Sequence, residues 1–246
     1  MVIHDSMKLN VQNYEIENQC NKKNKGKSQL EVYLFNLFLY NINETERRKI
    51  KMANYHRIDT CNVTDGPGCR AVIWFSGCPF HCKGCFSPQT WHPKSGQLYD
   101  KQARGEMIKA LEEPYCAGLT LLGGEPLAPY NIAEAYDLAV EAKRLGKTVW
   151  CYTGNTYEHI QDLDIMKYID VLVDGPFIIS KFNPNLKWRG SANQRVIDVQ
   201  MSKYLGKVVL HPDCNTVDEF YPEKAYDPCA DMTPEEIKAK YLDIYE

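Results

Sequence analysis

Three cysteines fall within eight residues, in the segment Cys78-Pro-Phe-His-Cys82-Lys-Gly-Cys85. Thiolates are soft ligands that suit iron–sulfur clusters and zinc. Three of them in one short loop can hold three corners of a 4Fe-4S cube and leave the fourth iron open, and an open metal position is typical of a catalytic site. A zinc site would need a fourth ligand, and His81 and His92 are close in sequence. The loop therefore predicts a metal site and favours iron–sulfur, with zinc left open.

Three further loops have features of a ligand site. Leu122-Gly-Gly-Glu-Pro126 places two glycines at the end of a candidate strand, where a ligand can approach the backbone closely, although a plain turn would explain them as well. Thr153-Gly154 and Asp174-Gly-Pro176 also follow candidate strands. Ligands bind at the carboxyl ends of strands in α/β sheets and barrels. Asp174 stays open between a ligand contact and a residue that only starts a turn.

The elements that must position these loops alternate between β-rich and helical runs from about residue 70 onward, which predicts βα units and a parallel sheet. The candidate strands are Ala71–Ser76, Gly118–Leu122, Thr148–Tyr152, Val171–Asp174 and Val196–Val199, with Val208–Leu210 as a sixth candidate. The candidate helices are Lys101–Glu113, Asn131–Leu145, Glu158–Tyr168 and, after a capping box at Thr233–Glu236, Ile237–Tyr245.

Composition limits the class of protein. Ten cysteines in 246 residues are too few for a disulfide scaffold, so we expect the four at Cys61, Cys69, Cys116 and Cys151 to be small apolar side chains. A net charge of −3 gives no electrostatic reason to expect a nucleic-acid partner. The longest apolar run, Leu30–Ile42, is shorter than the roughly 20 residues of a spanning helix. The sequence predicts no membrane segment and a cytoplasmic protein.

Three regions are predicted along the chain. Residues 1–51 are rich in Asn and Lys and contain no Pro, which indicates a disordered extension or, because Met52 opens a natural-looking start, a misassigned start codon. Residues 52–205 are expected to form the main domain. Residues 206–246 are expected to form a C-terminal extension that ends in the terminal helix.

The cysteine spacing, preceded by Phe75-Ser-Gly77 and followed by Phe86, resembles the signature of the radical S-adenosylmethionine (SAM) superfamily, and Gly123-Gly-Glu-Pro126 resembles its GGEP loop. The resemblance implies a 4Fe-4S cluster on Cys78, Cys82 and Cys85, with SAM on the open iron. It implies reductive cleavage of SAM to methionine and a 5′-deoxyadenosyl radical, with no catalytic group beyond the cluster and SAM. The implied fold is α/β, a partial (βα) barrel with about six mostly parallel strands, open on one side. The implied cofactor-binding residues are Gly84, Cys85, Phe86, Gly123, Gly124, Glu125 and Thr153.

Two other segments narrow the resemblance. Asp65-Gly-Pro-Gly68 resembles a segment of the activases that make glycyl radicals, and Arg189-Gly-Ser-Ala-Asn-Gln-Arg195 resembles the RGSxNQR segment of the anaerobic ribonucleoside-triphosphate reductase-activating proteins. The match runs from about Tyr55 to Val199. It implies an oxidoreductase that generates a glycyl radical on the large subunit of the anaerobic (class III) reductase, with a reduced flavodoxin or ferredoxin type electron donor. The implied partner contacts are Trp188, Arg189, Asn193 and Arg195.

Other interpretations remain open from the sequence. The same chemistry could serve another glycyl radical enzyme such as pyruvate formate-lyase, although the Arg189-Gly-Ser segment argues against this. A non-catalytic zinc or iron–sulfur module that regulates a partner is an alternative of a different class. The segment Trp188–Arg195 could also be a solvated polar loop, although its planar donors suit the recognition of carbonyl groups.

Overall fold

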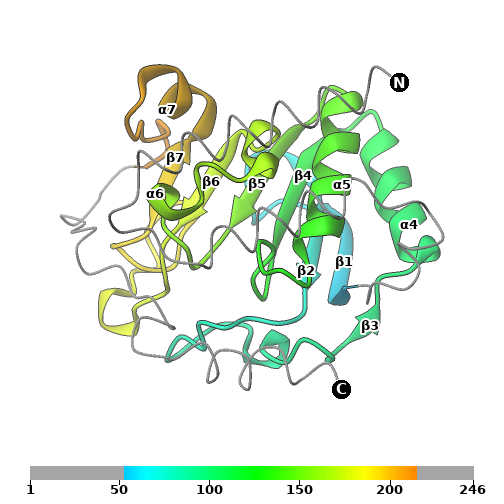
Figure 1. Ribbon diagram of the computed structural model, residues 1–246, viewed down its shortest axis with the longest axis horizontal. Coiled ribbons are helices and arrows are strands. Elements are labelled where there is room, and N and C mark those ends of the chain that lie inside the picture. Colours follow the sequence, from blue (N-terminus) through cyan, green and yellow to red (C-terminus); the bar gives the residue numbers. More distant parts are fainter. Residues whose placement is uncertain (1–52, 215–246) are drawn as a thin grey trace, which may run out of the picture. The chain divides into compact units, whose positions relative to one another are not determined.

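A computed structural model describes residues 53–214 (Figure 1). These residues form a seven-stranded sheet in the order β3-β1-β2-β4-β5-β6-β7. The strands are β1 (Asn54–Asn62), β2 (Cys69–Phe75), β3 (Gln97–Leu98), β4 (Cys116–Gly123), β5 (Thr148–Tyr152), β6 (Val171–Asp174) and β7 (Arg195–Asp198). The helices are α4 (Lys101–Glu112), α5 (Ile132–Arg144), α6 (Tyr157–Ile160) and α7 (Val199–Leu205), with 3₁₀ turns at Pro88–Thr90, Asp164–Lys167 and Ile179–Lys181.

The middle of the sheet is parallel and its two sides are antiparallel. Strands β2, β4, β5 and β6 pair in parallel, whereas β1 and β3 on one side and β7 on the other run antiparallel to their neighbours. The predicted α/β class is therefore confirmed. The five main candidate strands correspond to β2, β4, β5, β6 and β7, although β7 is antiparallel to β6. The sixth candidate, Val208–Leu210, is not a strand and forms one isolated bridge, from Leu210 to Ile197. The sequence did not predict β1, because its residues do not alternate between apolar and polar.

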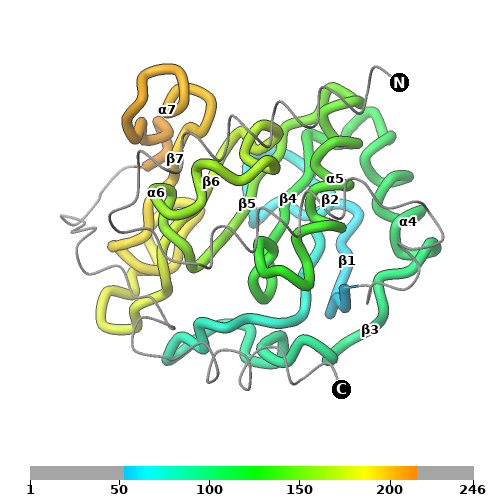
Figure 2. The backbone as a smooth tube through the Cα atoms, viewed as in Figure 1, coloured from blue at the N-terminus to red at the C-terminus, as the bar shows by residue number. Residues whose placement is uncertain are grey.

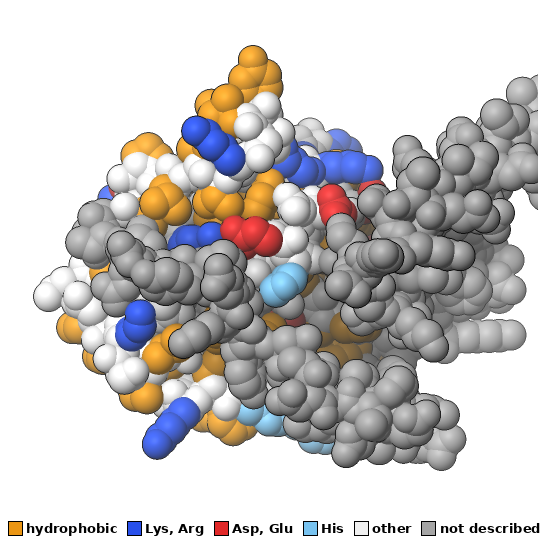
Figure 3. Space-filling view, turned by 60° about the vertical axis from the view of Figure 1, so that its left-hand side comes forward, with side chains coloured by type: hydrophobic (Ala, Val, Ile, Leu, Met, Phe, Trp, Pro, Cys, Tyr) orange, Lys and Arg blue, Asp and Glu red, His pale blue; other side chains and the backbone are white. Residues whose placement is uncertain are grey.

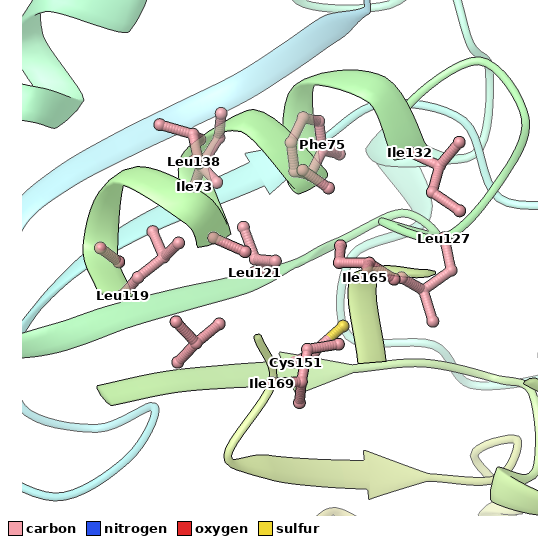
Figure 4. Close-up of a cluster of buried hydrophobic side chains, with 14 of the residues drawn as sticks. Ile73, Phe75, Leu119, Leu121, Leu127, Ile132, Leu138, Cys151, Ile165 and Ile169 are labelled. Carbon is pink, nitrogen blue, oxygen red and sulfur yellow. The ribbon is translucent and has the colours of Figure 1, made fainter. Parts of the chain in front are cut away.

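Two long helices cover one face of the sheet. Helices α4 and α5 begin and end within a residue of the predicted bounds, since Asp100 caps α4 by accepting from the N–H groups of Gln102 and Ala103, and Gly146 follows α5 with φ 71°. Apolar side chains of the sheet pack beneath the helices (Figure 4). The labelled part of this core comprises Ile73, Phe75, Leu119, Leu121, Leu127, Ile132, Leu138, Cys151, Ile165 and Ile169. A smaller cluster around Trp150 lies on the other face of the sheet, because successive strand residues point to opposite faces.

The last predicted helices differ from the structure. The helix expected over Glu158–Tyr168 is divided into α6 and the 3₁₀ turn at Asp164–Lys167, because Leu163 takes an extended conformation and packs against the core. Helix α7 was not predicted; Asp198 starts it by accepting from the N–H of Met201. The predicted terminal helix Ile237–Tyr245 and the predicted extension 1–51 lie outside the described residues. Within residues 53–214, no helix is long and apolar enough to cross a membrane.

Cys61 and Cys69 form a disulfide between the end of β1 and the start of β2, with a Cα–Cα distance of 5.0 Å. The expectation that both are merely apolar side chains is therefore wrong. The antiparallel pairing of β1 with β2 brings the two residues together, and this pairing could not be predicted because β1 has no strand pattern in the sequence. Cys116 and Cys151 are free and buried, as expected.

Arg70 is fully buried at the amino end of the parallel strands. Its guanidinium donates to Thr120 Oγ1 at 2.8 Å, to Thr148 Oγ1 at 3.0 Å and to the Leu119 carbonyl at 2.7 Å, and burial lowers its pKa to about 10. A Cβ on Gly66 would lie 2.8 Å from Arg70 Cδ. The Asp65-Gly-Pro-Gly68 segment therefore packs over this guanidinium, at the opposite end of β2 from the cysteine loop.

Gly118 on β4 should not tolerate a side chain. An alanine Cβ there would lie 2.2 Å from the Thr148 carbonyl oxygen and 2.7 Å from Arg70 Nη2, so we expect Gly118→Ala to lower the free energy of unfolding by about 2–3 kcal/mol. The matched control is Gly105→Ala on the exposed face of α4, where a Cβ meets nothing within 4 Å. Helix propensity should make that variant about 0.8 kcal/mol more stable. Urea unfolding of both variants measures the contrast, and equal effects would contradict it.

Candidate iron–sulfur site

Four loops meet at the carboxyl edge of the parallel strands. The cysteine loop (residues 77–86) follows β2, the Gly123–Pro126 loop follows β4, Thr153-Gly154 follows β5, and Asp174–Pro176 ends β6. Because β2, β4, β5 and β6 are parallel neighbours, these ends lie side by side. The prediction that the loops share one edge is confirmed. In Figure 2 the teal segment after β2 runs along this edge toward the yellow loop after β6.

The three cysteines of the loop are free and half-buried. Burial raises the pKa of the Cys78 thiol to about 12, with a further rise from Glu125, while N–H groups of Phe80 and His81 oppose it. Burial also raises the pKa of Cys82, and the N–H of Phe177 opposes that rise. The N–H of Ser87 donates to Cys85 Sγ at 3.3 Å. The N–H groups of Phe80, His81 and Phe177 thus oppose the effect of burial on Cys78 and Cys82, but burial outweighs them.

The donor chemistry of this loop fits an iron–sulfur cluster. Among residues 53–214, no group of three or more His, Cys, Asp and Glu side chains is gathered as a metal site, so the fit rests on the three free thiols and their N–H donors. Both nearby imidazoles contact other residues. His81 stacks on Trp91 with ring centroids 4.7 Å apart, and Nδ1 of His92 accepts from the N–H of Lys94. Zinc with one of these imidazoles as a fourth ligand therefore stays an alternative.

The Gly123-Gly124 pair lets the β4 loop lie directly on the cysteine loop. The N–H of Gly124 donates to the Phe75 carbonyl and the N–H of Glu125 donates to the Gly77 carbonyl, both at 2.7 Å. Gly123 has φ 106°, and a Cβ on Gly124 would lie 2.2 Å from the Gly77 oxygen. Both glycines are therefore required for this backbone approach, whatever ligand the loop also binds.

Glu125 connects the β4 loop to the β5 loop. Its side chain is buried, and its carboxylate accepts from the N–H of Leu127, the N–H of Gly154 and the hydroxyl of Thr153, each at 2.9 Å. Glu125 and Thr153, both predicted as cofactor contacts, thus bond to each other. Burial raises the pKa of Glu125 to about 7, although these three hydrogen bonds oppose the rise. Contact of either residue with a cofactor stays a prediction.

This shift gives a pH-dependent prediction. The pKa of Glu125 is raised from 4.5 to about 7 in the folded chain, so between these values the folded state binds a proton that the unfolded state has lost. Stability from this group is complete below pH 4.5 and falls by about 1.4 kcal/mol per pH unit until about pH 7. We expect the free energy of unfolding of Glu125→Gln to lack this decrease between pH 5 and pH 7. Urea unfolding at pH 5, 6 and 7 measures the difference. The control is Glu112→Gln, at an exposed position of α4, which should keep the wild-type pH dependence. If the free energy of unfolding changes with pH equally in wild type and in Glu125→Gln, the prediction is wrong.

Asn131 is a site residue that the sequence did not reveal. It is fully buried, and its Nδ2 donates to the carbonyls of Ser76 and Glu125, both at 2.9 Å. It therefore ties the strand end before Cys78 to the β4 loop. Its side chain makes no cap hydrogen bond to α5, and the sequence placed Asn131 only at the start of that helix.

A buried ionic cluster fixes the end of β6. Asp174 is fully buried and accepts from the guanidinium of Arg195 and, at 2.8 Å, from the N–H of Tyr157. The same guanidinium donates to both carboxylate oxygens of Glu158, at 2.9 and 2.8 Å. Burial alone would lower the pKa of Arg195, but the two carboxylates raise it well above its ordinary value. Asp174 therefore pairs with Arg195 within the protein. Its predicted contact with a ligand stays a prediction.

The RGSxNQR segment folds back onto the loop after β6. Asn193 Nδ2 donates to the Pro176 carbonyl at 2.8 Å, and Gln194 Nε2 donates to the Gly175 carbonyl at 3.1 Å. Arg189 donates to the Gln194 carbonyl at 2.5 Å. Of the four predicted partner contacts, Arg189, Asn193 and Arg195 are each less than 8% exposed. Trp188 is half-buried and donates from Nε1 to Asp213 at 2.9 Å. Contact of these residues with a partner stays a prediction.

Gly84 and Phe86, the predicted neighbours of the cofactor, lie on the outer side of the cysteine loop. Gly84 has φ 76° and a Cβ there would lie 2.9 Å from Ile179 Cδ1. Phe86 is 68% exposed, and its ring lies 5.0 Å from that of Phe177. The cysteine loop thus touches the segment after β6 at both residues.

Comparisons with known proteins agree with this site. A family model described as a 4Fe-4S single cluster domain matches residues 64–197, which include all three loop cysteines. Similar proteins named anaerobic ribonucleoside-triphosphate reductase-activating protein come from Enterobacteria phage T4, 42% identical over 146 residues, and Vibrio cholerae, 39% identical over 147 residues. A third, from Escherichia coli K12, is 35% identical over 149 residues. These matches cover 57–58% of this chain and 92–97% of the relatives. The chain therefore belongs to the family of anaerobic ribonucleoside-triphosphate reductase-activating proteins, with a 4Fe-4S single cluster domain.

Proposed function

We propose that this protein activates an anaerobic (class III) ribonucleoside-triphosphate reductase by generating a glycyl radical on its large subunit. The observation that carries the proposal is the cysteine loop, with three free, half-buried thiols at the carboxyl edge of the parallel strands, in a chain of this family. The proposed cluster ligands are Cys78, Cys82 and Cys85. A 4Fe-4S cluster held there, with SAM on its open iron, supplies reductive cleavage of SAM to methionine and a 5′-deoxyadenosyl radical.

The residues of the chain position this chemistry. Gly123 and Gly124 keep the β4 loop against the cysteine loop, so their backbone groups are proposed to bind the methionyl end of SAM, beside Glu125 and Thr153. Gly84 and Phe86 are proposed to flank the rest of SAM. The Glu125 carboxylate and the Asn131 amide hold the loops in place through buried hydrogen bonds, so the loops need little rearrangement when the cofactors bind.

The remaining assignments extend this proposal. The sheet is proposed to be a partial (βα) barrel whose open side admits a macromolecular substrate. A reduced flavodoxin or ferredoxin type protein is proposed as the electron donor, in the cytoplasm. Residues 52–205 are proposed as the activase domain and 206–246 as its extension, although Val209 and His211 bond to the edge of β7.

The test is anaerobic reconstitution of the protein with iron and sulfide, followed by reduction in the presence of SAM and the reductase from the same genome. We expect visible absorption from the cluster, 5′-deoxyadenosine as product, and the electron paramagnetic resonance doublet of a glycyl radical on the reductase. Pyruvate formate-lyase in place of the reductase should give no doublet. Tightly held zinc with no 5′-deoxyadenosine would support the regulatory-module alternative instead.

A further inference from the structure

An exposed apolar surface adjoins the cysteine loop, and we name it the aromatic rim. It consists of Phe86, Phe177, Ile178, Ile179 and Phe182. The exposed fractions are 68% for Phe86, 47% for Ile179 and 46% for Phe182. Single exposed apolar residues are common in soluble proteins, but a contiguous group is typical of a binding surface. In Figure 3, which turns the left-hand side of Figure 1 forward, hydrophobic side chains lie at several places on the described surface.

The rim residues contact one another although they come from two separate segments. The ring of Phe86 lies 5.0 Å from that of Phe177 and 5.7 Å from that of Phe182, between centroids. Phe177 and Phe182 are 6.3 Å apart. These are the separations at which aromatic rings attract one another. The rim is thus one surface, formed jointly by the cysteine loop and the segment after β6.

Residues of the RGSxNQR segment pack against the rim residues and bond to their backbone. A Cβ on Gly190 would lie 3.1 Å from the rings of both Phe86 and Phe177. Asn193 holds the Pro176 carbonyl at 2.8 Å, directly before Phe177, and Phe182 forms a bridge with Ser191. The buried polar residues of the segment therefore position the rim, while the rim itself presents the exposed contact area.

The rim is continuous with the site of the proposed chemistry. The ring of Phe86, a residue of the cysteine loop, contacts Phe177, and the side chain of Ile179 packs against Gly84, so rim and cysteine loop share contacts at two points. Residues 77–99 and 175–194 contain no Asp or Glu, although the whole chain has a net charge of −3. These two segments therefore bring only apolar, neutral polar and cationic side chains to the edge, among them exposed Lys83, while the Glu125 and Asp174 carboxylates of the neighbouring loops are buried.

We infer that the aromatic rim is the docking surface for the glycine-bearing segment of the reductase, which presents apolar side chains to it. The inference rests on the proposed function. A glycine Cα can react there only if the partner's backbone reaches the cysteine loop, and a segment that does so must cover Phe86 and its neighbours. Burial of the rim's apolar side chains then supplies binding free energy. A second copy of this chain has no such reason to approach the cysteines.

Phe182→Ala and Ile179→Ser test the inference in the reconstituted, full-length holoprotein, with the reductase from the same genome as the probe. Each should raise the Kd for the reductase at least about tenfold, which is ~1.4 kcal/mol, and raise the reductase concentration that half-saturates glycyl radical formation. Formation of 5′-deoxyadenosine without the reductase should stay within about twofold of wild type. Phe182→Leu, which keeps an apolar side chain, should fall between wild type and Phe182→Ala and guards against a folding defect.

The matched control is Tyr204→Ala on α7, an 83% exposed aromatic at the opposite edge of the sheet from the rim. It should leave the Kd unchanged. The inference is overturned if the rim variants bind the reductase as wild type does, or if they alter only self-association in sedimentation. Wild-type protein that neither binds the reductase nor installs a radical would instead overturn the proposed function, so the two failures are distinguishable.

Discussion

Cys82→Ala is expected to abolish 5′-deoxyadenosine formation and glycyl radical installation, with a loss of at least about a thousandfold. Two thiolates cannot hold three corners of a 4Fe-4S cube, so the cluster should not assemble or persist. The fold should remain, because Cys82 is half-buried on a loop and belongs to neither hydrophobic cluster. Iron content, visible absorption and 5′-deoxyadenosine per protein measure the loss.

The matched control for this variant is Cys116→Ala. Cys116 is also a free cysteine, but it is buried on β4 at the end of the sheet away from the cysteine loop. It should keep full iron content and activity and lose only a modest amount of stability, since a small apolar contact is removed. Equal loss of iron in both variants would indicate unfolding, and retained activity in Cys82→Ala would refute this assignment of the cluster ligands.

Much of the site could be predicted because the chemistry is local in sequence. Three cysteines in eight residues, and two glycines at the end of a buried strand, are visible without any tertiary structure. The parallel strands that bring these loops together were also predictable, since β4, β5 and β6 are short apolar runs between helical segments. The edge of the sheet at which these loops meet was therefore predicted correctly.

The missed features depend on contacts between distant residues. The buried hydrogen bonds of Asn131 reach Ser76, 55 positions away, and the Cys61–Cys69 disulfide depends on β1, whose residues show no strand pattern. Arg195 and Asn193 look like surface recognition residues in sequence, because arginine and asparagine are usually exposed. Their partners on the loop after β6 turn them inward, which only the folded chain shows.

Arg195→Met is expected to lower the free energy of unfolding by about 3–5 kcal/mol. Without the guanidinium, the fully buried carboxylate of Asp174 keeps, among residues 53–214, only the N–H of Tyr157 as a partner, and an uncompensated buried charge is strongly destabilising. Burial already raises the pKa of Asp174, and the hydrogen bonds from Arg195 are the main effect opposing that rise. Urea unfolding measures the loss. The double variant Asp174→Asn with Arg195→Met should recover part of it, because no fully buried charge is then left unpaired; the Glu158 carboxylate, which also loses Arg195, is 38% exposed.

Arg144→Met on α5 is the control for this prediction. Arg144 also pairs with a carboxylate, Glu141 at 2.7 Å, but its side chain is 60% exposed, so its loss should cost less than about 1 kcal/mol. The comparison also separates the two roles considered for Arg195. If Arg195→Met unfolds as wild type does but binds the reductase weakly, Arg195 is a partner contact. A large loss of stability that the double variant partly restores would show that it positions the end of β6, on which the aromatic rim depends.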